Sequence, residues 1–275
     1  MAFLPPGAGA PDYFPCHYGT SRLTFRGPKR DLTGEYLAVL GGTESYGRDV
    51  SMPFSAVLEA DLGIPIANLA CQNAGPDVYL ADRPTLEVAA EAHLVIVQLT
   101  GVQNVSNRYY TVHPRRNDRF VAASPLLRSL YREVDFTEFH FTRHLLRSLA
   151  ARGKDRFAPI AAELKALWLQ RMTAILDRLP RRRVLLWLSD RPPQTPGEGG
   201  DLAGASWLVD RAMIDQLLPL APAYVECIPA SPDPVGSRPP PPAAALPIGS
   251  ETWLPDTETH ARAAGALRPV VEKLL

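Results

Sequence analysis

Short apolar runs alternate with helical stripes over the first hundred residues of the chain. Residues 36–40, 64–69 and 94–100 are apolar runs of strand length, and each ends in a polar turn. Between them, apolar residues at helical spacing predict helices over 54–62 and 84–92. The run 94–100 is apolar on both faces, which is typical of a buried parallel strand. This β-α-β-α-β order predicts a parallel sheet with helices on both faces.

The pattern changes between residues 101 and 180, where no run of strand type occurs. Within this segment, apolar residues at helical spacing over 157–179 predict a long helix. Strand-like runs return at 183–189 and 223–228, and a last helix is expected over 258–275. The expected fold class is therefore α/β: a three-layer α/β/α sandwich around a five-stranded parallel sheet of flavodoxin-like order 2-1-3-4-5.

We expect a single domain over residues 1–275, because the strand-like runs extend from one end of the chain to the other. Residues 1–34, rich in Pro, Gly and aromatic residues, are expected to form an extended arm over the surface. Residues 101–180 are expected to form a mainly helical insertion. A long amphipathic insertion is a candidate contact surface for a protein partner or for a second copy in a homo-oligomer.

Charge and composition argue against several classes of partner. The chain has 29 Lys and Arg against 29 Asp and Glu, so it has no general basic field that would attract nucleic acid. No segment approaches the length of a membrane span, and the N-terminus lacks the pattern of a signal peptide. The cysteines Cys16, Cys71 and Cys227 have no metal-binding spacing. We therefore expect a cytoplasmic protein that uses no membrane, metal or cofactor.

Three polar turns follow the first apolar runs: Gly41–Gly47, Ala70–Asp77 and Gly101–Asn107. In an open parallel sheet, ligands bind beyond the carboxyl ends of the strands, where the strand order changes direction. The order 2-1-3-4-5 brings these turns to one crevice, and Asp256–His260, ahead of the last helix, can fold over the same edge. Glycines permit close backbone approach, and a helix N-terminus offers unpaired N–H groups. The turns therefore predict a site here, with an ordinary βα turn as the alternative.

Four segments resemble, in the same order, the sequence blocks of the SGNH (GDSL-like) hydrolases. Gly41–Gly47 (GGTESYG) resembles the first block, Gly-Asp-Ser-x-x-x-Gly, and Asn68–Gly75 resembles the second. Gly101–Asn104 (GVQN) resembles the third, Gly-x-Asn-Asp, and His260–Gly265 is similar to the last, His-Pro-x-x-x-Gly. The first block is also similar to that of a bacterial family of unknown function with a GGT-type block, which implies no activity.

The SGNH resemblance implies a serine-type hydrolase centred on Thr43. Thr43 stands where the family has its nucleophilic serine, and its β-methyl group crowds the hydroxyl. His260 stands at the position of the catalytic base. The family's orienting aspartate falls at Thr257, so Asp256 or Glu258 would have to orient the imidazole.

The same resemblance implies an oxyanion hole and a set of ligand contacts. In the second block, the backbone N–H of Ala70 is the expected oxyanion donor. In the third block, Gln103 stands at the asparagine position and Asn104 follows it, so the amide donor is one of these two side chains. Ser45 and Asn73, in the first two turns, are further expected ligand-binding residues.

A basic and aromatic segment, Asn107–Phe120, begins at the third turn. Its Arg108, Arg115 and Arg116 suit a planar anion such as a carboxylate, sulfate or phosphate, including one carried by a sugar. The alternative is a solvated loop in which these arginines pair with Asp118 and other acids.

Two functions from different classes fit these features. The first is an SGNH-like esterase or deacylase that acts on an acyl ester of a carbohydrate-like or other small substrate. The second is a catalytically inactive protein of the same fold that binds an anionic glycan or a protein partner. Gly42 and Thr43, which replace the family's acid and serine, favour the second, whereas the His260 block and the glycine turns favour the first.

Overall fold

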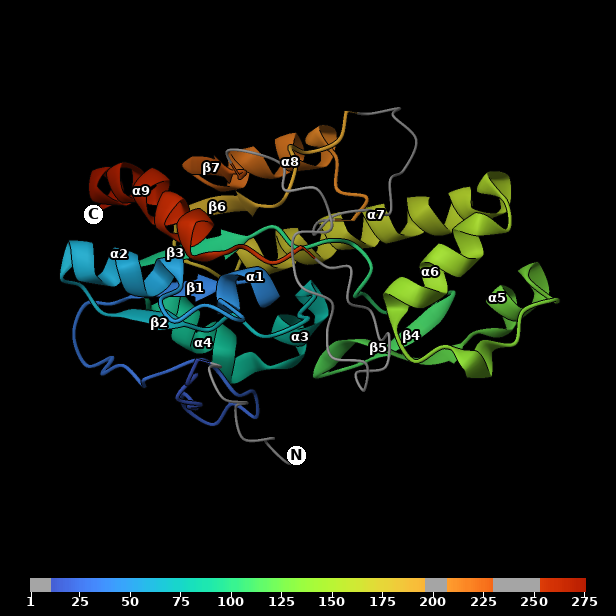
Figure 1. Cartoon of the computed structure of the whole chain (residues 1–275), viewed down its shortest axis with the longest axis horizontal. Helices are drawn as coiled ribbons and strands as arrows, with labels where there is room; N and C mark the ends of the chain where they lie inside the picture. The colour runs from blue at the N-terminus through green and yellow to red at the C-terminus, as the bar shows by residue number, and fades with distance from the viewer. Residues whose placement is uncertain (1–10, 196–206, 230–252) are drawn as a thin grey trace.

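The computed structural model describes residues 11–195, 207–229 and 253–275 and has a five-stranded parallel sheet at its centre (Figure 1). The strand order is β2-β1-β3-β6-β7, and every neighbouring pair is parallel. The strands are β1 (Leu37–Leu40), β2 (Ile66–Asn68), β3 (Leu94–Gln98), β6 (Arg183–Leu188) and β7 (Ala223–Cys227). The predicted order 2-1-3-4-5 is confirmed.

Successive side chains along each strand point to opposite faces of the sheet, and this alternation divides the core into two layers. On one face, Leu37 and Val39 pack with helices α2 (Phe54–Leu62) and α9 (Thr257–Leu274). Ala38 and Leu40 belong to the core of the other face. The helices of that face are α3 (Pro76–Ala81), α4 (Arg83–Glu91), α7 (Lys154–Leu176) and α8 (Arg211–Leu217). Because both faces are covered, the strands are mainly apolar, and the three-layer sandwich is as expected.

Helix α7 has 23 residues and lies where the apolar spacing predicts a helix. Its residues Ile160, Leu164 and Trp168 are fully buried at helical spacing. Trp168 Nε1 donates a hydrogen bond to the Thr100 carbonyl at 2.8 Å, which ties the helix to the loop after β3. No helix in the described ranges, α7 included, is long and apolar enough to cross a membrane.

The segment 101–180 contains a β-hairpin, so the expectation that it has no strand was wrong. Strands β4 (Tyr110–His113) and β5 (Arg116–Ala123) pair antiparallel beside the sandwich (Figure 1). The hairpin is solvated on one side, so neither strand shows the continuous apolar run of a buried parallel strand. The rest of the segment up to α7 is helical: α5 (Pro125–Leu130), the 3-10 helix η1 (Phe136–Glu138) and α6 (Thr142–Ala151).

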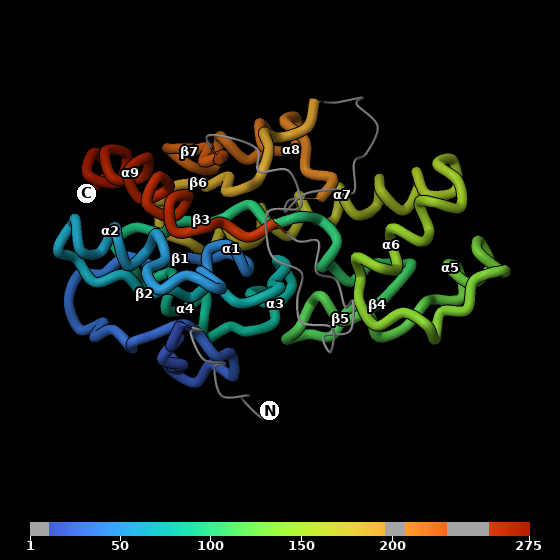
Figure 2. The backbone as a smooth tube through the Cα atoms, viewed as in Figure 1, coloured from blue at the N-terminus to red at the C-terminus, as the bar shows by residue number. Residues whose placement is uncertain are grey.

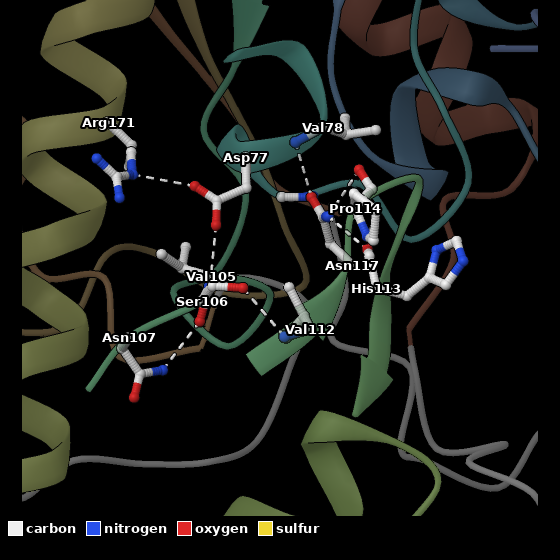
Figure 3. A network of polar contacts seen from close by, with 11 residues as sticks. Asp77, Val78, Val105, Ser106, Asn107, Val112, His113, Pro114, Asn117 and Arg171 are labelled. Carbon is white, nitrogen blue, oxygen red and sulfur yellow. Dashed lines mark hydrogen bonds and ion pairs between the residues drawn. The ribbon is translucent and has the colours of Figure 1, made fainter. Parts of the chain in front are cut away.

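Asn117 of β5 fastens the hairpin to the start of α3 (Figure 3). Its side-chain oxygen accepts hydrogen bonds from the backbone N–H groups of Gly75 at 3.1 Å and Val78 at 2.9 Å. Its amide nitrogen donates to the His113 carbonyl at 3.0 Å, across the hairpin turn. The side chain is fully buried, so both of its polar groups are satisfied within the protein.

Asp77 makes a second connection from the same helical turn (Figure 3). One carboxylate oxygen accepts a hydrogen bond from the Ser106 N–H at 2.8 Å, and the other pairs with Arg171 of α7 at 3.0 Å. The Ser106 hydroxyl in turn accepts from the Val112 N–H of β4 at 3.0 Å. The first turn of α3 therefore holds the loop after β3, the hairpin and α7 together.

The described part of the N-terminal arm, residues 11–34, runs along the outside of the sandwich (Figure 2). The Ser21 hydroxyl donates to the Asp82 carboxylate at 2.7 Å, which joins the arm to the start of α4. Arg26 is buried, and its guanidinium donates to the carbonyls of Val50 at 2.7 Å and Ser51 at 2.8 Å. The arm thus fixes the loop that precedes α2.

We expect Asn117→Ala to lower the free energy of unfolding by about 2 kcal/mol or more, because two buried N–H groups lose their acceptor at about 1–3 kcal/mol each. Urea unfolding of the two proteins measures this difference. Asn117→Asp keeps the acceptor oxygen and is expected to recover part of the loss. If the Asn117→Ala protein unfolds at the wild-type urea concentration, the fastening of the hairpin contributes nothing to stability.

Candidate active site

The turn between β1 and helix α1 (Thr43–Tyr46) packs backbone closely against side chains. Gly42 is the N-cap of this helix and has an extended conformation. A Cβ at Gly41 would lie 2.6 Å from the Gln98 side-chain oxygen, and one at Gly42 would lie 2.9 Å from a Glu44 carboxylate oxygen. Both glycines therefore serve the close approach of these two side chains to the turn.

Asn73 joins the three polar turns at the edge of the sheet. Its backbone N–H donates to the Thr43 hydroxyl oxygen at 2.8 Å, and the Thr43 hydroxyl donates to the Asn73 side-chain oxygen at 3.2 Å. Asn104, from the third turn, donates its amide N–H to the Asn73 carbonyl at 3.0 Å. Asn73 has a φ of 58°, a conformation that asparagine tolerates better than most residues. The structure thus brings together Thr43, Asn73 and Asn104.

The N–H directed at the Thr43 hydroxyl belongs to Asn73 and not to Ala70. The Ala70 N–H, the oxyanion donor expected from the sequence, donates to the Asn68 side-chain oxygen at 3.1 Å and is occupied there. Asn73 was expected only as a ligand contact. A signal for its backbone role was present, because an asparagine within a polar, glycine-containing turn is suited to a positive φ.

Ser45 and Gln103, two other expected site residues, are buried. Each has a side-chain oxygen that lacks a hydrogen-bond partner within the part of the chain that the structure describes. The Asn104 side chain is engaged at both ends, because its oxygen accepts from the Thr142 hydroxyl of α6 at 2.8 Å. In this arrangement the Asn104 side chain links Asn73 to α6.

A buried polar pair that the sequence analysis missed lies beneath the turn. Gln98, the last residue of β3, accepts hydrogen bonds from the N–H groups of Gly42 at 2.9 Å and Ser45 at 3.2 Å. Its amide nitrogen donates to the Glu44 carboxylate at 2.9 Å. Burial raises the pKa of Glu44, while the Gln98 hydrogen bond and the positive charge of Arg143 act in the opposite direction. In the sequence, the signal for this buried pair was the polar residue Gln98 at the end of an apolar strand.

His260 is fully buried between α9 and α2. Its Nδ1 accepts a hydrogen bond from the backbone N–H of Phe54 at 3.0 Å, and its ring stacks on the Phe54 ring with centroids 6.0 Å apart. Its Nε2 has no hydrogen-bond partner within the described residues. Burial, together with the charge of Arg26, lowers the pKa of His260 to about 4, against the opposing effect of Asp256. A neutral ring that accepts at Nδ1 carries its proton on Nε2.

Asp256 is the N-cap of α9, and its carboxylate accepts from the Thr259 N–H at 2.8 Å. That hydrogen bond lowers the pKa of Asp256. Within the described ranges, neither Asp256 nor Glu258 is hydrogen-bonded to the imidazole, whose Nδ1 is taken by Phe54. In the same ranges, no group of three or more His, Cys, Asp or Glu side chains is arranged to hold a metal ion.

The three arginines of the hairpin segment do not converge on one point. Arg108 precedes β4, where it pairs with Glu163 of α7 at 3.1 Å and lies over the Tyr109 ring. Arg115 and Arg116 are at the hairpin turn, at the other end of β4. The ends of a four-residue strand are roughly 10 Å apart. The segment therefore presents a pair of neighbouring arginines at the turn and a separate one at its base.

The buried neutral state of His260 predicts a loss of stability on acidification. Its pKa is about 4 in the folded protein and about 6.5 in an unfolded chain. The unfolded chain takes up the proton first, so this stability is fully present above about pH 6.5 and is lost as the pH falls toward 4. At about 1.36 kcal/mol per pKa unit, the full loss is about 3 kcal/mol.

Urea unfolding at pH 7 and pH 5 measures this effect. We expect His260→Gln to have a smaller pH dependence than the wild type, because the buried titrating ring is absent. His140→Gln, at an exposed histidine, is the control and should keep the wild-type dependence. An unchanged dependence in His260→Gln would show that His260 is not the group responsible.

Comparison with solved structures finds distant similarity over most of the chain. A carbohydrate esterase family 2 enzyme with a carbohydrate-binding domain from Corynascus thermopiles (Myceliophthora fergusii) is 11% identical, with 90% of this chain and 69% of that chain covered and a TM-score of 0.43. A family two carbohydrate esterase from Clostridium thermocellum, in complex with cellohexaose, is 14% identical, with coverage of 91% and 66% and a TM-score of 0.41. Phospholipase A1 from Streptomyces albidoflavus NA297 is 12% identical, with coverage of 88% and 99% and a TM-score of 0.41.

No sequence among the curated proteins matches this chain. The model of one protein family, described as a domain of unknown function (DUF6473), matches residues 1–275. The match spans the arm, the sandwich and the insertion. The chain therefore belongs to the DUF6473 family.

Proposed function

We propose that this protein is an SGNH-like hydrolase that cleaves an acyl ester of a carbohydrate-like or other small substrate, with Thr43 as its nucleophile. The observation that carries the proposal is the Asn73 N–H, which lies 2.8 Å from the Thr43 hydroxyl oxygen. A hydroxyl nucleophile needs such a donor beside it, because attack on a carbonyl places negative charge on the carbonyl oxygen close to the attacking atom.

The turn offers a second donor at the same place. The N–H of Thr43 has no hydrogen-bond partner among the residues that the structure describes. Together with the Asn73 N–H, it supplies two backbone donors beside the hydroxyl, and such donors need no reorganisation during the reaction. In the resting state the Asn73 N–H bonds to the hydroxyl itself. In the reaction it passes to the oxyanion as the hydroxyl oxygen bonds to the acyl carbon.

His260 is the proposed base that takes the Thr43 proton. Its Nε2 is the ring nitrogen without a partner among the described residues, but a base must present a lone pair there and keep its proton on Nδ1. The imidazole must therefore release the Phe54 N–H and exchange tautomers before it can act. Catalytic hydrogen bonds often form only in the substrate complex, so this requirement places the change at substrate binding.

The chemistry of the turn also supports the proposed substrate class. Thr43, Asn73 and Asn104 contribute hydroxyl and amide groups and no charge. Neutral donors and acceptors of this kind suit an uncharged substrate that is rich in hydroxyl groups. The small acyl esters of such a substrate are the bonds that we expect to be cleaved.

The second candidate is a catalytically inactive protein of the same fold that binds an anionic glycan or a protein partner. The observation that favours it is the hydrogen bond from the Phe54 N–H to His260 Nδ1, which leaves the ring in the wrong tautomer for a base. The position of Asp256 as a helix cap is consistent with it, because that carboxylate is engaged with the backbone. The paired arginines at the hairpin turn are the expected contact for an anionic ligand.

Turnover of p-nitrophenyl acetate and of acetylated sugars separates the two functions. For a hydrolase, Thr43→Ala and His260→Ala should each lower kcat by about 100-fold or more, since nucleophile and base are lost. Thr43→Ser should keep or raise kcat, because the methyl group that crowds the hydroxyl is removed. Wild-type inactivity on acetyl, longer acyl and sugar esters would favour the binding protein. Equal rates in wild type and His260→Ala would show that the reaction does not use this site.

Asn73 provides a test of the oxyanion donor. Asn73→Gly keeps the N–H and accepts the positive φ, but it removes the side-chain oxygen that binds the Thr43 proton. We expect kcat to stay within a few-fold of the wild type or to rise. Asn73→Ala makes the same deletion but is expected to lose about 1 kcal/mol of stability from the strained φ. A loss of turnover in Asn73→Gly as large as in Thr43→Ala would contradict a role confined to the backbone N–H.

A further inference from the structure

Glu44 and Gln98 control which N–H groups of the β1–α1 turn remain available. The Gln98 side-chain oxygen occupies the N–H groups of Gly42 and Ser45. The backbone N–H of Glu44 acts to lower the pKa of the carboxyl group of the same residue. Of the N–H groups of Gly42, Thr43 and Ser45, only that of Thr43 is without a partner in the described part of the chain.

We propose that Glu44 and Gln98 are positioning residues that hold the turn with the Thr43 N–H open beside the Thr43 hydroxyl. The inference rests on the proposed function for its catalytic consequence. Neither residue contacts the reacting atoms. They act by occupying the neighbouring donors and by fixing the direction of the turn.

The Glu44 carboxylate is what orients the Gln98 amide. It accepts from the Gln98 nitrogen at 2.9 Å, which leaves the Gln98 oxygen facing the two backbone donors. In the opposite orientation, the amide nitrogen would face two N–H groups and the amide oxygen would face a carboxylate. Buried contacts between two donors or between two acceptors are each costly, so one orientation is selected. Both side chains are buried, and water does not compete for these bonds.

The charges around Glu44 come from two other elements. Arg143 of α6 favours the ionised carboxyl group, whereas Asp190, after β6, disfavours it. Arg147 lies with Arg143 over the Trp207 ring, so the cationic side of this cluster belongs to α6. The pair therefore couples the β1–α1 turn to α6 and to the end of β6.

Exchange of the two side chains provides the test. In Gln98→Glu, two carboxyl groups would face each other, and they must share one proton to keep the hydrogen bonds. That proton is bound with a pKa above the unfolded value, so its stabilisation is present at low pH and is lost as the pH rises. In the double variant Glu44→Gln/Gln98→Glu, the carboxylate accepts from the two N–H groups and the new amide donates to it. The hydrogen-bond pattern is then complete with the carboxyl group ionised, so no shared proton is needed at pH 8.

We expect Gln98→Glu to lower kcat for p-nitrophenyl acetate about 100-fold at pH 8, with KM within about two-fold, and to recover toward pH 5.5. The double variant should return kcat at pH 8 to within about 10-fold of the wild type. Gln216→Glu, at an exposed glutamine of α8, is the matched control and should follow the wild type. A kcat profile of Gln98→Glu that follows the wild type, or a double variant no better than the single one, would overturn the proposal.

Thermal unfolding of the same variants keeps this test independent of the proposed function. The melting temperature of Gln98→Glu should fall as the pH rises from 5.5 to 8, and the double variant should not show this fall. If the wild type has no esterase turnover, the proposed function fails and the melting temperatures alone decide whether Glu44 orients Gln98. If turnover is present but the melting temperatures of the single and double variants are alike at pH 8, the positioning role fails and the proposed function stands.

Discussion

The pair of hydrogen bonds between Thr43 and Asn73 is the contact on which the edge of the sheet depends. The two residues follow neighbouring strands, β1 and β2, and Asn73 turns its N–H inward because its φ is positive. Gln98 makes the equivalent connection from β3. This edge of the sheet is thus held together by amides and a hydroxyl, whose hydrogen bonds have fixed directions.

The two sides of the candidate site differ in whether their groups already have the hydrogen-bond geometry that the proposed reaction needs. On the side of α3, the Thr43 hydroxyl lies beside the Asn73 N–H, and the Thr43 N–H has no partner among the described residues. On the side of α2 and α9, the imidazole is neutral, buried and bound at Nδ1 to the backbone of α2. The proposed hydrolase requires the proton of His260 on Nδ1, whereas the hydrogen bond from Phe54 fits a ring protonated on Nε2.

Much of the fold could be predicted because both faces of the sheet are covered. Apolar runs such as 94–98 and the helical stripe of α7 follow directly from this burial. The hairpin β4–β5 could not, since a two-stranded sheet with a solvated face leaves no such pattern. Within the candidate site, the strand order was sufficient to predict that the three polar turns would meet. The hydrogen-bond partner of His260 could not be predicted, because Phe54 lies 206 positions away and contributes only its N–H.

The first turn of α3 serves two purposes at once. The N–H groups of Gly75 and Val78, two and five residues after Asn73, donate to Asn117 of the hairpin. Asp77 pairs with Arg171 and so connects the same turn to α7. The hairpin and the Thr43–Asn73 contact are therefore both connected to the start of α3. Asn117 therefore fixes the backbone that directly follows the residue in contact with the Thr43 hydroxyl. Although its strands lie outside the sandwich, the hairpin thus helps to set the position of the second polar turn.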